Sequence, residues 1–194
     1  MTDNTNLTEA ELIKHCVNGD RLCQKLFYKK FASKMFGVCL GYVNSRDDAK
    51  DILQDGFVKV FASLKEYKGA GSLEGWVRRI IVNTAIDYYR KTIKGSQNVN
   101  VEKAKSIEAE THILEGMHAK ELLDLIHKLP EGARAIFNLY VIEGYNHVEI
   151  AEMLDISQGT SKSQFSRARS LLQEWIGKIY SEKKSFSRIN EGPR

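Results

Sequence analysis

The chain has 194 residues, of which 42% are hydrophobic and 28% are charged, and its formal net charge is +4. This length and apolar content suffice for one ordinary folded domain or two small ones, which argues against a disordered chain. No run approaches the roughly 18 uncharged apolar residues of a membrane-spanning helix, and the polar start MTDNTNLTEAE lacks the layout of a signal peptide. We therefore expect a cytoplasmic protein that does not insert into a membrane.

Apolar residues recur at spacings of three and four along most of the chain, and no alternating run of β-branched residues of useful length occurs. The two prolines, Pro130 and Pro193, leave long stretches in which helices can form. The fold class is predicted to be all-α. Three cysteines lack the CxxC spacing of zinc sites, and we interpret them as reduced core residues: Cys16, Cys23 and Cys39.

Four helices are predicted in the first half of the chain, over residues 9–17, 20–43, 46–64 and 72–91. Three of them begin after a hydroxyl side chain that can accept hydrogen bonds from the free amides of a first turn. These side chains belong to Thr8, Ser45 and Ser72. Thr8 and Glu11 together have the form of a capping box. Residues 1–94 are assigned to one helical domain.

The second half is predicted to hold a separate domain. Residues 95–112 lose the aromatic content and the apolar periodicity, so we interpret them as a flexible linker. Helices are predicted again over residues 113–180, where Pro130 suits the first turn of a helix. The basic tail, residues 181–194, has little apolar material and is predicted to be disordered. The expected architecture is two small helical domains joined by a linker.

The strongest local motif is a helix-turn-helix that begins near Tyr145. Asn146 can cap a short helix, residues 155–157 suit a tight turn, and Ser157 can cap a second helix. The inward face of the first helix is predicted to hold Val148, Ile150, Ala151 and Leu154. The second helix offers polar and basic side chains to bases and phosphates: Gln158, Thr160, Ser161, Lys162, Gln164, Arg167 and Arg169. The alternative is an ordinary helical hairpin with a solvated basic face.

An acidic edge marks the helix predicted over residues 46–64. Asp47, Asp51 and Asp55 follow one another at intervals of four, so that like charges repel along one side of the helix. A basic partner on this edge would explain the pattern. Plain solubility is the alternative interpretation.

The helix predicted over residues 72–91 is apolar around most of its circumference. Its polar side chains form a single stripe, made of Arg79, Asn83, Asp87, Arg90 and Lys94. Four aromatic residues lie near basic ones in this part of the chain: Tyr67, Trp76, Tyr88 and Tyr89. Aromatic and basic side chains together can bind single-stranded DNA by stacking and by phosphate contacts. A purely structural role of the aromatic residues in the core is the alternative.

The string DDAKDILQDGFVKVF, followed by GSLEGWVRRIIVNTAIDYYRK, closely resembles region two of the sigma-70 family. The string LIHKLPEGARAIFNLYVIEGYNHVEIAEMLDISQGTSKSQFSRARSLL resembles region four, and nothing between the two is long enough for region three. The chain is thus similar to the extracytoplasmic-function (ECF) subfamily over about residues 20–180. That resemblance implies a sigma factor that binds core RNA polymerase and directs promoter-specific transcription initiation.

The resemblance also implies which residues bind which partner. The β′ clamp helices of the polymerase would contact Asp48, Asp51, Gln54 and Asp55. The melted minus-10 element would contact Lys68, Ser72, Trp76, Arg79, Asn83, Asp87 and Arg90. The minus-35 duplex would contact the second helix of the helix-turn-helix, at the polar and basic residues named above. Further implied partners are the polymerase β flap and an anti-sigma factor, which in this family is often anchored in a membrane.

Three positions depart from the usual pattern of the family. Asp155 stands where the turn generally has Gly, Ser161 where the recognition helix has Val, and Gln164 where it has Arg. Asp tolerates the left-handed backbone better than most residues, so we expect the turn to persist. The other two replacements affect the expected base specificity rather than the fold.

Two other classes of protein are considered beside the sigma factor. A helix-turn-helix repressor or activator would bind DNA as a dimer without being a polymerase subunit, but the acidic edge and the helix over 72–91 argue against it. An enzyme is not expected, because the five histidines form no ligand or triad spacing with carboxylates. No catalytic residue, cofactor or metal is predicted.

Overall fold

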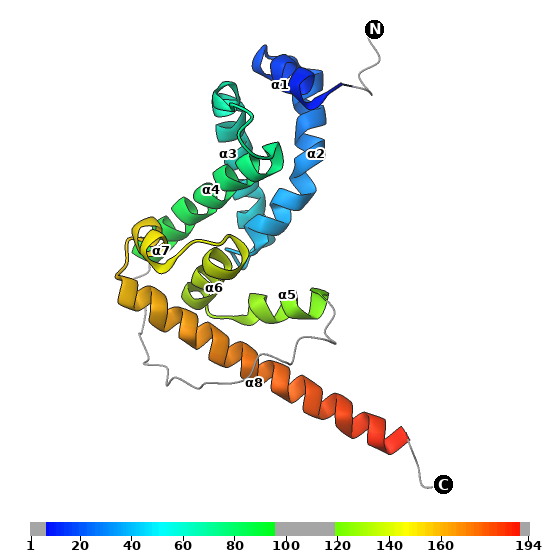
Figure 1. Ribbon diagram of the computed structural model, residues 1–194, viewed down its shortest axis with the longest axis vertical. Coiled ribbons are helices and arrows are strands. Elements are labelled where there is room, and N and C mark those ends of the chain that lie inside the picture. Colours follow the sequence, from blue (N-terminus) through cyan, green and yellow to red (C-terminus); the bar gives the residue numbers. More distant parts are fainter. Residues whose placement is uncertain (1–6, 96–118, 191–194) are drawn as a thin grey trace. The chain divides into compact units, whose positions relative to one another are not determined.

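The computed structural model describes residues 7–95 and 119–190 (Figure 1). Within these two ranges every regular element is helical and no strand occurs, which confirms the predicted all-α class. The chain divides into two compact units, Met1–Gln97 and Asn98–Arg194, and each is described by itself. Apart from Gly95, the predicted linker over residues 95–112 lies outside the described residues. None of the helices in the described ranges has the length and apolar character needed to span a bilayer.

Over residues 7–95, the structure describes four α-helices and one short 3-10 helix in the first unit. They are α1 (Glu9–Val17), α2 (Arg21–Leu40), α3 (Arg46–Ser63), η2 (Leu64–Glu66) and α4 (Leu73–Gly95). The predicted capping box at α1 is present, since the Glu11 N–H donates to Thr8 Oγ1 and the Thr8 N–H donates to Glu11 Oε2. Ser45 caps α3, and Ser72 accepts a hydrogen bond from the Gly75 N–H at the start of α4. The local start signals therefore define these helices.

The core of the first unit lies where α2, α3 and α4 meet. Buried aromatic and aliphatic side chains fill it, with the rings of Phe27 and Phe31 4.9 Å apart. Helices α3 and α4 approach closely at Gly56, where an added Cβ would collide with the side chain of Ile81. Cys16, Cys23 and Cys39 are free and buried, as the sequence predicted.

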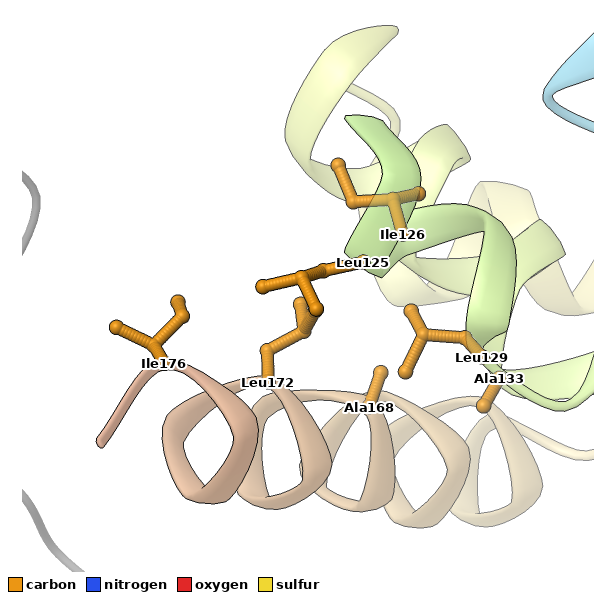
Figure 2. Packing of buried hydrophobic residues seen from close by; sticks show 7 residues of the cluster. All are labelled: Leu125, Ile126, Leu129, Ala133, Ala168, Leu172 and Ile176. Carbon is orange, nitrogen blue, oxygen red and sulfur yellow. The ribbon is translucent and has the colours of Figure 1, made fainter. Parts of the chain in front are cut away.

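The second unit contains α5 (Ala119–Lys128), α6 (Glu131–Phe137), the π-helical turn η3 (Asn138–Ile142), α7 (His147–Leu154) and α8 (Gln158–Asn190). Pro130 is the N-cap residue of α6, one position before the first turn in which the sequence predicted it. Figure 2 shows the buried cluster in which α5 and α6 face α8. It consists of Leu125, Ile126, Leu129, Ala133, Ala168, Leu172 and Ile176.

Helix α8 continues through Asn190, well past the helix end near residue 180 that the sequence predicted. Residues 181–194 were expected to be disordered, but residues 181–190 are helical in the structure. The physical reason is local, because no helix breaker stands in this stretch before Gly192 and Pro193.

Candidate nucleic-acid and polymerase interfaces

The acidic edge of α3 is largely exposed. Asp47, Asp51, Gln54 and Asp55 lie on the surface, whereas Asp48 is half-buried. Lys50 Nζ lies 2.7 Å from Asp47 Oδ1, and this contact is the main reason why the pKa of Asp47 is lowered. Asp48 instead turns to α4, where its hydrogen bond to the Tyr88 hydroxyl is the main cause of a raised pKa of that phenol. Three of the four predicted polymerase contacts are therefore open to a partner.

A pocket of about 470 Å³ lies between α3 and α4. Two predicted binding sets meet there, because Asp55 of the acidic edge and Asp87 and Arg90 of the polar stripe all line it. Lys59 Nζ lies 3.2 Å from Asp87 Oδ2 and joins the two helices across the pocket. Val58 also lines it and is 64% exposed. Exposed apolar surface between charged side chains is typical of a site that a protein partner covers.

The polar stripe of α4 has the arrangement that the sequence predicted. Arg79, Asn83 and Asp87 are exposed and Arg90 is half-buried, while the side chain of Lys94 lies outside the described residues. The opposite sides of the helix are buried through Val77, Ile81, Val82, Ala85 and Ile86. The helix is therefore held on nearly all sides by the core and offers one polar side to a ligand.

The loop before α4 places an aromatic pair beside this stripe. The rings of Tyr67 and Trp76 are 5.5 Å apart, and the Tyr67 hydroxyl donates a hydrogen bond to the Gly71 carbonyl. Gly69 and Gly71 adopt positive φ angles of 75° and 83°, which a residue with a Cβ adopts only with strain. Lys68 and Ser72 are exposed on the same loop.

Tyr88 does not join the pair of Tyr67 and Trp76, because it bonds Asp48 and lines the pocket between α3 and α4. Three of the four predicted aromatic residues are therefore divided between two places, and the fourth, Tyr89, is half-buried. Tyr67 and Trp76 remain as the candidates for stacking on a base, while Tyr88 belongs to the contact of α3 with α4.

The helix-turn-helix is formed as predicted. Asn146 and Glu149 make a capping box at α7, and Asp155 ends that helix in the left-handed region with φ 57° and ψ 48°. Asp155 is the single non-glycine residue with positive φ in the described ranges, and it confirms that Asp supports the turn here. The Ile156 N–H then donates to the Ala151 carbonyl, and Ser157 Oγ accepts from the Thr160 N–H at the start of α8.

Two residues of α8 that were predicted to contact DNA are buried in this structure. Ser161 is 0% exposed and Gln164 is 6% exposed. Both lie on the helical face that continues through Ala168 and Leu172 into the buried cluster, because residues three, four and seven positions apart share one face. Their side chains therefore contact the interior of the second unit rather than the exposed side of α8.

The exposed side of α8 keeps the other predicted contacts. Gln158, Lys162 and Arg169 are exposed, and Thr160 and Arg167 are half-buried. The hydroxyls of Ser157 and Thr160 lie 2.9 Å apart, so Thr160 takes part in the cap of the helix. The N-terminal part of α8 thus presents a polar and basic side, as a recognition helix does.

The sequence did not predict an apolar surface that lies next to the helix-turn-helix. Val148, expected on the inward face of α7, is 52% exposed, whereas Ile150 and Leu154 are buried. Tyr140, Val141 and Ile142 of η3 are also exposed. The π-helical turn shifts the phase of the side chains in η3, which periodicity analysis of an ideal helix does not anticipate.

The fold and these surfaces define a two-unit helical protein that carries a helix-turn-helix, the motif of many DNA-binding proteins, in its second unit. The family models agree: Sigma-70 region 2 matches residues 27–94, and Sigma-70 region 4 matches residues 119–172. The chain belongs to the sigma-70 family, in its ECF subfamily. It is an RNA polymerase sigma factor rather than a repressor or activator that acts apart from the polymerase.

Known relatives are similar over most of their length. The ECF RNA polymerase sigma-E factor of Haemophilus influenzae is 30% identical over 184 residues, which cover 88% of this chain and 96% of the relative. The protein of the same name from Escherichia coli strain K12 is 27% identical over 182 residues, with coverages of 88% and 95%. A solved structure of the sigma factor RpoE from Bartonella quintana, in complex with the anti-sigma factor NepR, aligns with a TM-score of 0.47 and 21% identity over 80% of this chain and 96% of that one.

Proposed function

We propose that the two units divide the work of promoter-specific initiation. The exposed edge of α3 docks on the β′ clamp helices, α4 and the preceding loop hold the melted minus-10 element, and α8 reads the minus-35 duplex. The observation that carries this proposal is the polar stripe of α4, which is exposed on a helix whose other sides are buried. A helix placed in this way has its polar side chains available to a ligand at little cost in reorganisation.

Core polymerase would contact Asp51, Gln54 and Asp55 and cover the neighbouring pocket with its exposed Val58. Charged side chains around an apolar centre suit a protein interface, since the apolar part supplies affinity and the charges orient the partner. Asp48 has a different part in this proposal. Its hydrogen bond to Tyr88 holds α4 against α3, beside the interface.

The minus-10 strand would follow Lys68, Ser72, Trp76 and the stripe of α4. Stacking of a base on an aromatic side chain is worth about 1–3 kcal/mol, which is comparable to the few kcal/mol that base extrusion costs. Arg79 and Arg90 would bind phosphates, and Asn83 can hydrogen-bond an unpaired base edge. Asp87 is held by Lys59 and would limit how far the strand can move toward α3.

The minus-35 duplex would meet Gln158, Lys162 and Arg169 on the exposed side of α8, with Thr160 and Arg167 beside them. Ser161 and Gln164 are excluded from direct contact because they are buried. Each unit alone would bind DNA weakly, and core polymerase would join the two contacts into one bivalent interaction. We therefore expect the free chain to bind promoters poorly.

Protein partners of the second unit would use its exposed apolar surface, made of Tyr140, Val141, Ile142 and Val148. The polymerase β flap would bind to this surface, and an anti-sigma factor would bind there too. Because both partners cover the same apolar side chains, they would exclude each other. Because its partners, RNA polymerase and promoter DNA, are in the cytoplasm, the protein would act there. The chain acts as a polymerase subunit and performs no catalysis of its own.

Transcription with purified core polymerase tests the proposal. The full chain is added to core enzyme on fragmented DNA of the source organism, and transcript starts are sequenced. A new set of starts sharing two upstream elements is expected. D51K/D55K should abolish binding to core, whereas R79A/N83A should retain core binding and lose strand opening, detected with permanganate. A chain that neither binds core nor changes the starts contradicts the proposal, and so does palindrome binding without polymerase.

A further inference from the structure

Three side chains with different donor atoms meet at the turn between α1 and α2. His15 lies in the last turn of α1, Asp20 caps α2, and Cys23 lies in the first turn of α2. One nitrogen, oxygen or sulfur atom from each of them lies within 4.8 Å of the other two. The three residues precede the segment matched by the region 2 model, which begins at residue 27, so the cluster is a feature of this chain outside that segment.

The backbone of the turn already orients these side chains. The Asp20 N–H donates to the His15 carbonyl at 3.1 Å, and Gly19 has a φ of 83° that allows the chain to reverse there. Asp20 Oδ1 accepts hydrogen bonds from the N–H groups of Leu22 and Cys23. Because Oδ1 is held in this way, the second oxygen, Oδ2, is directed to His15, whose Nδ1 lies 4.0 Å away.

The donor set suits a borderline cation. Thiolate sulfur, imidazole nitrogen and carboxylate oxygen are the ligands of Zn²⁺ in proteins, at about 2.0–2.3 Å, which places tetrahedral ligand atoms roughly 3.3–3.8 Å apart. Since the three ligand atoms lie within 4.8 Å of one another, their separations exceed this by at most about 1.0–1.5 Å. The exposed side chain of His15 can supply the contraction and also leaves a path for the ion to enter.

We propose that His15, Asp20 and Cys23 form a Zn²⁺-binding site that joins α1 to α2. The bound ion takes one ligand from α1, one from the turn and one from α2, and a water molecule completes the coordination at the exposed side. Without the ion, α1 is held by its buried Leu12 and Cys16, while its polar contacts, such as the pair of Lys30 and Glu9, are exposed and stabilise little. The ion adds a link that these polar contacts do not supply, and so further stabilises the attachment of α1 to the rest of the first unit.

Cobalt is the spectroscopic probe for this site. The reduced full chain, stripped with a chelator, is titrated with Co²⁺, and absorption from thiolate-to-cobalt charge transfer is followed before Zn²⁺ is added to displace it. Three ligand variants are compared: C23S, H15Q and D20N. Asn is a good N-cap residue, so D20N removes the carboxylate while keeping the start of α2. C39A is the matched control, because Cys39 is buried in the same helix away from the cluster.

One equivalent of Co²⁺ should give the charge-transfer band in the wild-type chain and in C39A. C23S should lose the band, and H15Q and D20N should bind at least about tenfold more weakly. Zn²⁺ should raise the melting temperature of the wild type and of C39A but not of H15Q, whose exposed substitution leaves the metal-free fold intact. A wild-type chain without the band, or a band that survives in C23S, overturns the proposal.

Discussion

His147 Nδ1 lies 2.9 Å from the hydroxyl oxygen of Ser161, and this contact joins the first turn of α7 to the first turn of α8. Ser161 is completely buried, and the His147 ring stacks on Tyr140 with a centroid distance of 4.6 Å. The resemblance to region four implies Val at this position of the recognition helix. Here a hydrogen bond takes the place of that apolar contact, so the two residues form a matched pair.

A double-mutant cycle measures this pair. S161V should destabilise the second unit by about 0.5–1.5 kcal/mol, because it removes the hydrogen bond between Ser161 and the half-buried ring of His147. The same replacement in an H147A background should cost less, which gives a coupling free energy on the order of 1 kcal/mol in urea unfolding. Equal costs in the two backgrounds would show that the pair does not interact.

The stability of the second unit should fall as the pH is lowered. Burial, and secondarily Lys162, hold the pKa of His147 below its ordinary 6.5, and burial followed by Arg134 does the same for His127. The unfolded chain then binds protons more readily than the folded one, so stability is complete above about pH 6.5 and decreases below it. Thermal melting of H147A between neutral and mildly acidic pH should show a smaller decrease than the wild type. A decrease should remain in H147A, to which His127 contributes.

Replacement of Gly56 by Ala should destabilise the first unit. The added Cβ would meet the side chain of Ile81, which is fully buried and has little room to move, and such overpacking typically costs about 1–3 kcal/mol. G37A is the matched control in α2, where nothing lies within 4 Å of an added Cβ. It should be neutral or stabilise by about 0.5–1 kcal/mol. Denaturant unfolding measures both variants, and the slope of free energy against denaturant should stay unchanged while the midpoint falls for G56A and not for G37A. An equal shift of the midpoint in the two variants would contradict the close approach of α3 and α4.

The exposed side of α8 should carry the phosphate contacts of the minus-35 element. K162A should weaken binding of the holoenzyme to promoter DNA and reduce the slope of log affinity against log salt by about 1. K178A, on the same helix but paired with Glu174 at 2.6 Å, is the control and should leave the slope unchanged. If K178A and K162A change the slope alike, α8 does not contact DNA through the side assigned here.

Much of the fold follows from short-range signals in the sequence. The caps at Thr8, Ser45 and Asn146 and the left-handed turn at Asp155 depend on hydrogen bonds between neighbouring residues, and all were predicted. The exposed stripe of α4 was also predicted, because most of its other residues are too apolar to face water. Caps formed by neighbouring residues, and a clear contrast between apolar and polar sides of a helix, can be recognised without knowing which other helices pack against it.

The burial of Ser161 and Gln164, the exposure of Val148 and the meeting of His15, Asp20 and Cys23 were decided by the tertiary structure alone. Small polar and short aliphatic side chains are compatible with either side of a helix, so their place depends on how other helices cross it. In the second unit, α6, η3 and α7 pack against α8. The π-helical turn of η3 changes which of its side chains face α8. The sequence by itself thus determined most of the helices and the starts that local caps define, while the packing between helices determined which of their polar residues can meet a partner.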